Sequence, residues 1–126
     1  PNVIQEVIEL NLADYVAMDI KAPLEKYQDI TNSGIDTKKI VESINLIVNS
    51  GIKYEFRTTV LKTQLSEEDI MQIKGLASGA RLWFLQKYIP SENLSNNSQN
   101  ELNYTNDEFE KFRKIIKNSV IECLIR

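Results

Sequence analysis

Charged side chains stand at the ends of two segments that are otherwise typical of buried β-strands. Asp19 and Lys21 close a segment that begins at Asp14, and Arg57 lies late in a segment that begins at Lys53. In parallel α/β folds the carboxyl ends of the strands form the ligand-binding edge of the sheet. One carboxylate and two cations at that edge suit a ligand that carries a carboxylate together with an amine or hydroxyls.

A structural role explains the same residues in a different way. An ion pair between Asp19 and Arg57, with Lys21 in solvent, also satisfies charges that lie late in buried strands. Both interpretations are open from the residues alone. Lys87 and Tyr88, at the end of a third predicted strand, are explained by solvent exposure.

The chain contains one cysteine, Cys123, and no histidine. It cannot form an internal disulfide bond, which is typical of a reducing compartment and predicts a cytoplasmic protein. Catalytic Ser-His and Cys-His pairs and most zinc sites are excluded. The net charge of -3 does not favour nucleic acid or an anionic membrane as a partner. No segment reaches the roughly 18 apolar residues of a membrane span.

Alternating helix and strand patterns are predicted to position the charged residues. Helical spacing of apolar residues predicts helices over 2–10, 36–48, 66–79 and 105–116. Segments rich in β-branched and aromatic residues predict strands over 14–20, 53–60, 81–86 and 120–125. Strands joined by helices are parallel, with right-handed crossovers. The sequence therefore predicts an α/β fold with about four parallel strands, either doubly wound or part of a (β/α) barrel.

Residues 1–126 are predicted to form a single domain, with a polar surface loop rich in Asn and Ser over 91–104. The aromatic residues of the strands are expected in the core or against helices, namely Tyr54, Phe56, Trp83 and Phe84. Cys123 is expected to be buried as a small apolar side chain.

The segment 14–20 has the composition of an internal strand, although only a helix is predicted before it. We therefore expect that strands are missing on its N-terminal side. An unpaired edge with apolar residues invites pairing with another chain. The sequence thus predicts self-association through this edge.

Three segments carry a resemblance to a known family: DYVAMDIKAP at 14–23, SGIKYEFRTTV at 50–60 and LWFLQKYIP at 82–90. In this order and spacing they resemble radical S-adenosylmethionine activating enzymes. The resemblance is greatest to the activating protein of anaerobic ribonucleoside-triphosphate reductase, and pyruvate formate-lyase activating enzymes are more distant. The Asp-Ile-Lys and Phe-Arg-Thr-Thr segments are its specific parts.

The resemblance implies a partial (β/α)₆ barrel and a [4Fe-4S] cluster held by a CxxxCxxC loop. It implies that S-adenosylmethionine binds the cluster through its amine and carboxylate and yields a 5′-deoxyadenosyl radical. That radical abstracts hydrogen from a glycine of a partner glycyl-radical enzyme. The family's S-adenosylmethionine-binding positions match Asp19, Lys21 and Arg57, and Gln86 matches a glutamine of the ribonucleotide-reductase branch. Tyr88 stands where the pyruvate formate-lyase branch has histidine, so no role is transferred to it.

The sequence departs from the family at the cluster, because three thiolates are needed and the chain has one cysteine. We therefore expect the C-terminal half of an activating enzyme, with half of a cofactor site and no activity by itself. A truncated or proteolysed piece of a longer protein, or a naturally short gene product, would explain this. The alternative is a non-enzymatic, flavodoxin-like α/β binding module that uses the same edge of its sheet.

Overall fold

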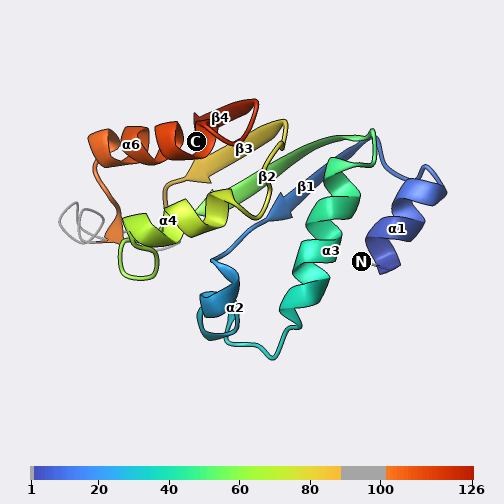
Figure 1. The fold of residues 1–126 in the computed structure, drawn as a ribbon, viewed down its shortest axis with the longest axis horizontal. Helices are drawn as coiled ribbons and strands as arrows, with labels where there is room; N and C mark the ends of the chain where they lie inside the picture. The colour runs from blue at the N-terminus through green and yellow to red at the C-terminus, as the bar shows by residue number, and fades with distance from the viewer. Residues whose placement is uncertain (1, 89–101) are drawn as a thin grey trace.

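The computed structural model describes residues 2–88 and 102–126 (Figure 1). The expected polar loop over 91–104 therefore lies almost entirely outside the described residues. The described elements follow the predicted alternation of helices and strands. They are α1 (Asn2–Glu9), β1 (Tyr15–Asp19), α2 (Leu24–Thr31), α3 (Thr37–Val48), β2 (Lys53–Thr59), α4 (Glu67–Lys74), β3 (Leu82–Gln86), α6 (Asn106–Lys117) and β4 (Glu122–Ile125).

Side-chain caps fix the first turns of three helices. Ser66 and Asp69 form a reciprocal capping box at the start of α4, and Thr105 and Glu108 form another at the start of α6. The Asp36 carboxylate accepts a backbone N–H in the first turn of α3. These bonds satisfy N–H groups that a helix start otherwise leaves unpaired. The predicted starts of these helices are confirmed.

The helix α4 ends earlier than the sequence predicted. Its last residue is Lys74, and residues 75–79 form turns instead of continuing to Gly79. Gly79 has a φ of +85°, a conformation that glycine adopts without the steric cost of a Cβ atom. The apolar Ala77, which the pattern placed on the helix face, is buried from this turn.

The four described strands form one parallel sheet in the order β1-β2-β3-β4. Each strand therefore pairs with the next one along the chain. Right-handed crossovers that always advance in one direction place their helices on the same face of the sheet. A flavodoxin-like sheet reverses direction and carries helices on both faces. The described sheet thus has the winding of part of a (β/α) barrel, and it is not closed.

Helices α3, α4 and α6 lie on one side of the sheet, as Figure 1 shows. Side chains along β3 alternate between buried and half-buried, which matches a sheet with one covered face. Three of the four aromatic residues expected in the core are buried there: Tyr54, Phe56 and Trp83. Cys123 is buried on the same side, as predicted.

Phe84 is the exception among the predicted core aromatics. It alternates with the buried Trp83 and Leu85, so its ring faces the open side of the sheet. The guanidinium of Arg126 lies 3.8 Å from the centre of that ring. The helix-packing prediction is therefore wrong for Phe84, because no helix of the described residues lies on the face that it occupies.

A polar network crosses the open face of the sheet. The Tyr15 hydroxyl donates to Glu55 Oε1 at 2.9 Å, and Arg126 lies 3.5 Å from Glu55 Oε2. Desolvation and the Glu55 carboxylate together raise the pKa of Tyr15. These polar and charged strand residues lie on the face of the sheet that no described helix covers (Figure 1).

The outer side of β1 has no strand beside it within the described residues. The Ile20 N–H donates to the Arg57 carbonyl at 2.8 Å, so the backbone groups of Ile20 face β2. The side to which the backbone N–H and C=O groups point alternates from one residue of a strand to the next. The backbone groups of Met18 therefore also face β2, and those of Ala17 face the open edge. The predicted open edge is present.

We expect the chain to self-associate through this edge. Replacing Ala17 by proline removes an outward-facing N–H and is expected to weaken association with little loss of stability. Met18→Pro is the matched control, because it removes an N–H that faces β2 and should destabilise the fold. Light scattering over a concentration series measures the mass. A monomer at every concentration of the unaltered chain would contradict the prediction.

Candidate functional site

A hollow of about 460 Å³ lies at the carboxyl ends of β1 and β2. Its wall contains all three charged residues that the sequence singled out: Asp19, Lys21 and Arg57. The turn after β1 and the register of β1 against β2 bring them together, since Asp19 lies directly opposite Arg57. We call this hollow the rim pocket.

Asp19 and Arg57 form an ion pair across the rim pocket. Asp19 Oδ1 lies 3.2 Å from Arg57 Nε, and the two side chains are 49% and 34% exposed. The contact lacks hydrogen-bond geometry, so the buried Arg57 Nε–H has no hydrogen-bond acceptor within residues 2–88 and 102–126. The pair predicted by the structural interpretation therefore exists, and its geometry leaves this buried N–H without an acceptor among the described residues.

Lys21 contributes a second cation to the rim pocket. Its ammonium group takes part in no ion pair with the described residues. A ligand carboxylate can therefore meet Lys21 and the exposed part of the Arg57 side chain, while Asp19 can accept from an amine or hydroxyl. This donor and acceptor set fits the amine and carboxylate of an amino acid.

Gln86 lies beside the rim pocket and is not part of its wall. The Thr59 hydroxyl, which does line the pocket, is 3.5 Å from Gln86 Oε1. Tyr88, to which the sequence assigned only solvent exposure, lines the pocket as well. The carboxyl-end edge thus continues from β1 to β3.

Sequence reasoning missed the part of the wall that comes from the segments after β1 and β2. These residues are Ile30, Thr31, Leu61 and Gln64. Their position in the connections that follow strand carboxyl ends is the signal that could have identified them. Ile30 and Leu61 add apolar surface beside the charged group, and Thr31 and Gln64 add polar groups.

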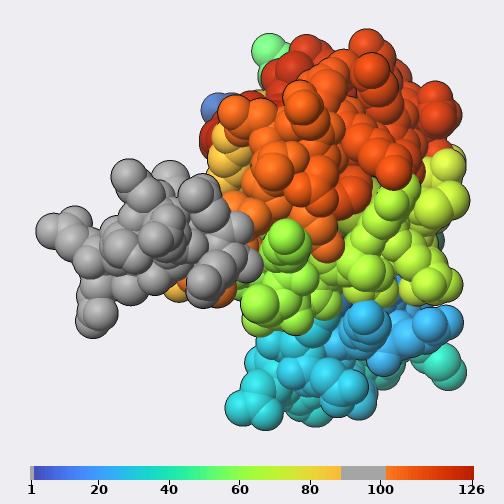
Figure 2. Space-filling model, turned by 90° about the vertical axis from the view of Figure 1, so that its left-hand side faces the viewer, coloured from blue at the N-terminus to red at the C-terminus, as the bar shows by residue number. Residues whose placement is uncertain are grey.

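The helix α2 is held at the rim by a buried carboxylate of α4. Lys26 Nζ donates to Asp69 Oδ2 at 2.8 Å, and the Ser66 N–H donates to the same oxygen at 2.8 Å. Burial alone would raise the pKa of Asp69, but these hydrogen bonds outweigh it and lower the pKa. Figure 2 shows α6, α4 and α2 stacked in that order, in orange, green and cyan.

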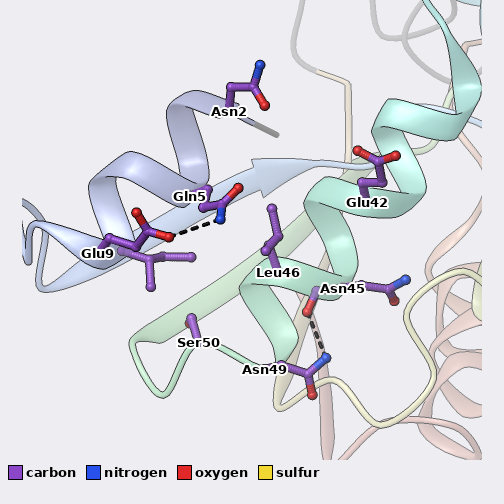
Figure 3. A pocket seen from close by; sticks show the side chains of 9 residues that line it. Asn2, Gln5, Glu9, Glu42, Asn45, Leu46, Asn49 and Ser50 are labelled. Atoms are coloured by element: carbon purple, nitrogen blue, oxygen red, sulfur yellow. Dashed lines mark hydrogen bonds between the residues drawn. The ribbon is translucent and has the colours of Figure 1, made fainter.

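A second hollow of about 550 Å³ lies between α1 and α3 (Figure 3). Its wall is rich in carboxamides, several of which bond locally: Gln5 donates to Glu9 at 2.9 Å, and Asn49 donates to the Asn45 carbonyl at 2.9 Å. No cation is among the described residues that line it. It contains none of the residues that the sequence singled out, so the rim pocket is the candidate site.

The chain does not supply the ligands of an iron–sulfur cluster. Its one cysteine, Cys123, is 1% exposed, and burial raises the pKa of the thiol to about 12. A cluster needs several thiolates close together, whereas this thiol stays protonated at neutral pH. Within the part of the chain that the structure describes, no cluster of Cys, Asp or Glu side chains could hold a metal ion.

Comparison with known proteins gives one informative match. The chain is 28% identical over 130 aligned residues to a Methanocaldococcus jannaschii protein named "Putative glycyl-radical enzyme activating enzyme". The match covers 100% of this chain and 54% of that protein, so the chain spans about half the length of its relative. No protein-family model matches. No solved structure matches. The chain is thus similar to a protein whose name is that of an activating enzyme for a glycyl-radical enzyme.

Proposed function

We propose that the chain is the C-terminal half of a radical S-adenosylmethionine activating enzyme and contributes part of its S-adenosylmethionine site. The observation that carries the proposal is the rim pocket, in which Asp19, Lys21 and Arg57 meet at the carboxyl ends of parallel strands. The similarity to an activating enzyme over the whole chain supports it. So does the sequential order of the strands.

Each charged residue has a role that its chemistry supports. Lys21 and the exposed part of the Arg57 guanidinium bind the carboxylate of S-adenosylmethionine, and Asp19 accepts from its amine or ribose hydroxyls. Gln86 adds an amide beside Thr59 at the next strand. When bound to a reduced [4Fe-4S] cluster, S-adenosylmethionine supplies the 5′-deoxyadenosyl radical in this family. The cluster ligands belong to another part of the enzyme, because this chain has one cysteine.

The partner that we propose is a glycyl-radical enzyme, specifically anaerobic ribonucleotide reductase. The relative's name supports the first statement. The second rests on the resemblance of 14–23, 50–60 and 82–90 to the ribonucleotide-reductase branch. The chain alone is proposed to be inactive, since radical formation requires the cluster.

We also propose a cytoplasmic location, on the basis of the cysteine content. Among the helices of residues 2–88 and 102–126, none has the length and apolar character needed to cross a bilayer. The flavodoxin-like alternative is not favoured, because the strand order lacks the reversal on which that fold depends.

Titration with S-adenosylmethionine tests the site. We expect weak, saturable binding that Asp19→Asn lowers by about tenfold, because the amine loses a charged acceptor. Glu110→Gln is the matched control: Glu110 also pairs with an arginine, Arg113, but lies on α6. Isothermal titration calorimetry measures both. Equal affinity of the two variants would remove Asp19 from the proposed site.

The gene tests the whole-protein proposal. The coding sequence upstream of the codon for Pro1 should contain a CxxxCxxC motif. Its distance from Pro1 should be no longer than the part of the relative that this chain does not match. A start codon directly before Pro1 would instead support the independent binding module.

A further inference from the structure

The segment Asp19–Lys21, which carries two of the three charges of the rim pocket, is held by hydrogen bonds on both sides. On the β2 side, the Thr58 hydroxyl donates to the Ile20 carbonyl at 2.7 Å. On the outer side, the Tyr27 hydroxyl accepts from the Lys21 N–H at 3.3 Å and donates to the Asp19 carbonyl at 3.4 Å. The segment is therefore fixed although β1 has already ended at Asp19.

A third residue fixes the orientation of the Thr58 hydroxyl, which donates to the carbonyl of Ile20. Trp83 Nε1 lies 3.0 Å from Thr58 Oγ1, and an indole N–H can only donate. The Thr58 oxygen thus accepts from Trp83, and its own proton is left for the Ile20 carbonyl. Thr58 and Trp83 are 1% and 0% exposed, so water does not compete for these groups.

The network reaches the rim pocket through the backbone alone. Thr58 and Trp83 do not line the pocket, whereas Asp19, Ile20 and Lys21 do. Asp19 and Lys21 stand on either side of Ile20, whose carbonyl Thr58 holds. The position of this carbonyl fixes the backbone between the two residues and so sets the direction of both side chains. A hydrogen bond elsewhere in the core would not act on the backbone beside Asp19 and Lys21.

We propose that Thr58, oriented by Trp83, and Tyr27 are positioning residues that hold Asp19 and Lys21 in the geometry that receives S-adenosylmethionine. The inference rests on the proposed function for the identity of the ligand. The positioning itself concerns only this chain and can be measured without a ligand. Arg57 provides the probe, since its Nε lies 3.2 Å from the Asp19 carboxylate.

The first experiment replaces Thr58 by valine and by serine. Thr58→Val removes the hydroxyl and is expected to shift the Arg57 Nε–H resonance in NMR spectra and to lower S-adenosylmethionine affinity by about tenfold. Thr58→Ser restores the hydroxyl and should keep both the resonance and the affinity close to those of the unaltered chain. Rescue by serine separates hydrogen bonding from packing.

The second experiment compares two tyrosines. Tyr27→Phe is expected to lower the affinity and to accelerate exchange of the Lys21 amide. Tyr54→Phe is the matched control, because the Tyr54 hydroxyl also accepts a backbone N–H, from Arg81 at 3.0 Å, but at the opposite end of the sheet. It should lose stability without a change at the rim.

The outcomes separate the two claims. An unchanged Arg57 resonance and unchanged affinity in folded Thr58→Val would overturn the positioning role. If the unaltered chain binds no S-adenosylmethionine but Thr58→Val shifts the Arg57 resonance, the positioning role stands and the proposed ligand is wrong.

Discussion

Replacing Phe56 by alanine is expected to lower the free energy of unfolding by about 3–5 kcal/mol. Phe56 is 0% exposed in the middle of β2. Its ring lies 5.3 Å from that of Tyr54 and 6.0 Å from that of Trp83, between centroids. The substitution removes apolar surface from the core and leaves a cavity that rigid strands cannot close. Urea denaturation followed by circular dichroism measures the change.

Met71→Ala is the control for this prediction. Met71 is a large apolar residue on α4, but it is 52% exposed. Its replacement should change the free energy of unfolding by no more than about 0.5 kcal/mol. Equal effects of the two substitutions would mean that the helix-covered face of the sheet is not the core of the protein.

Replacing Asp69 by alanine is expected to destabilise the protein by about 2–4 kcal/mol at neutral pH. The change removes the acceptor for both Lys26 and the Ser66 N–H, and Asp69 is only 4% exposed. Lys26 is 49% exposed, so solvent screens its share of the loss. Glu68→Ala, in the same helical turn but exposed, should have a much smaller effect.

The effect of Asp69→Ala is expected to depend on pH with a defined sign. Hydrogen bonding lowers the pKa of Asp69 in the folded protein below its ordinary value of 3.8. A carboxylate of this kind stabilises fully above its unfolded pKa and loses that contribution as pH falls through the folded pKa. The stability curves of the two proteins should therefore converge below about pH 4. A constant difference down to pH 2 would show that packing, not charge, accounts for the loss.

Local patterns in the sequence were sufficient to predict the order of the elements and the place of Asp19 and Arg57. Period-two and helical spacing depend on neighbouring residues, and capping residues such as Ser66 and Thr105 act within one turn. Parallel strands bring their carboxyl ends to one edge, so the meeting of the charged residues followed from the topology. The proposed ligand of these residues stays a prediction.

Properties that depend on distant contacts could not be predicted in this way. The orientation of Phe84 depends on which face the helices cover, and that depends on the order of all four strands. The hydroxyl of Thr58 bonds to a carbonyl 38 residues earlier in the chain. A threonine within a strand has no local signature that separates this role from ordinary β-propensity.

The position of β1 at the sheet edge divides the rim pocket between two regions of unequal local stability. Among the described strands, the one that carries Arg57 has a neighbour on each side, whereas the one that carries Asp19 has a single neighbour. Strands with fewer backbone bonds open at a lower free-energy cost than central ones. A ligand that bridges the two residues must therefore also keep β1 closed, and its observed affinity falls by the fraction of time that β1 is open. Whatever lies against the outer side of β1 consequently acts on ligand affinity without touching the ligand.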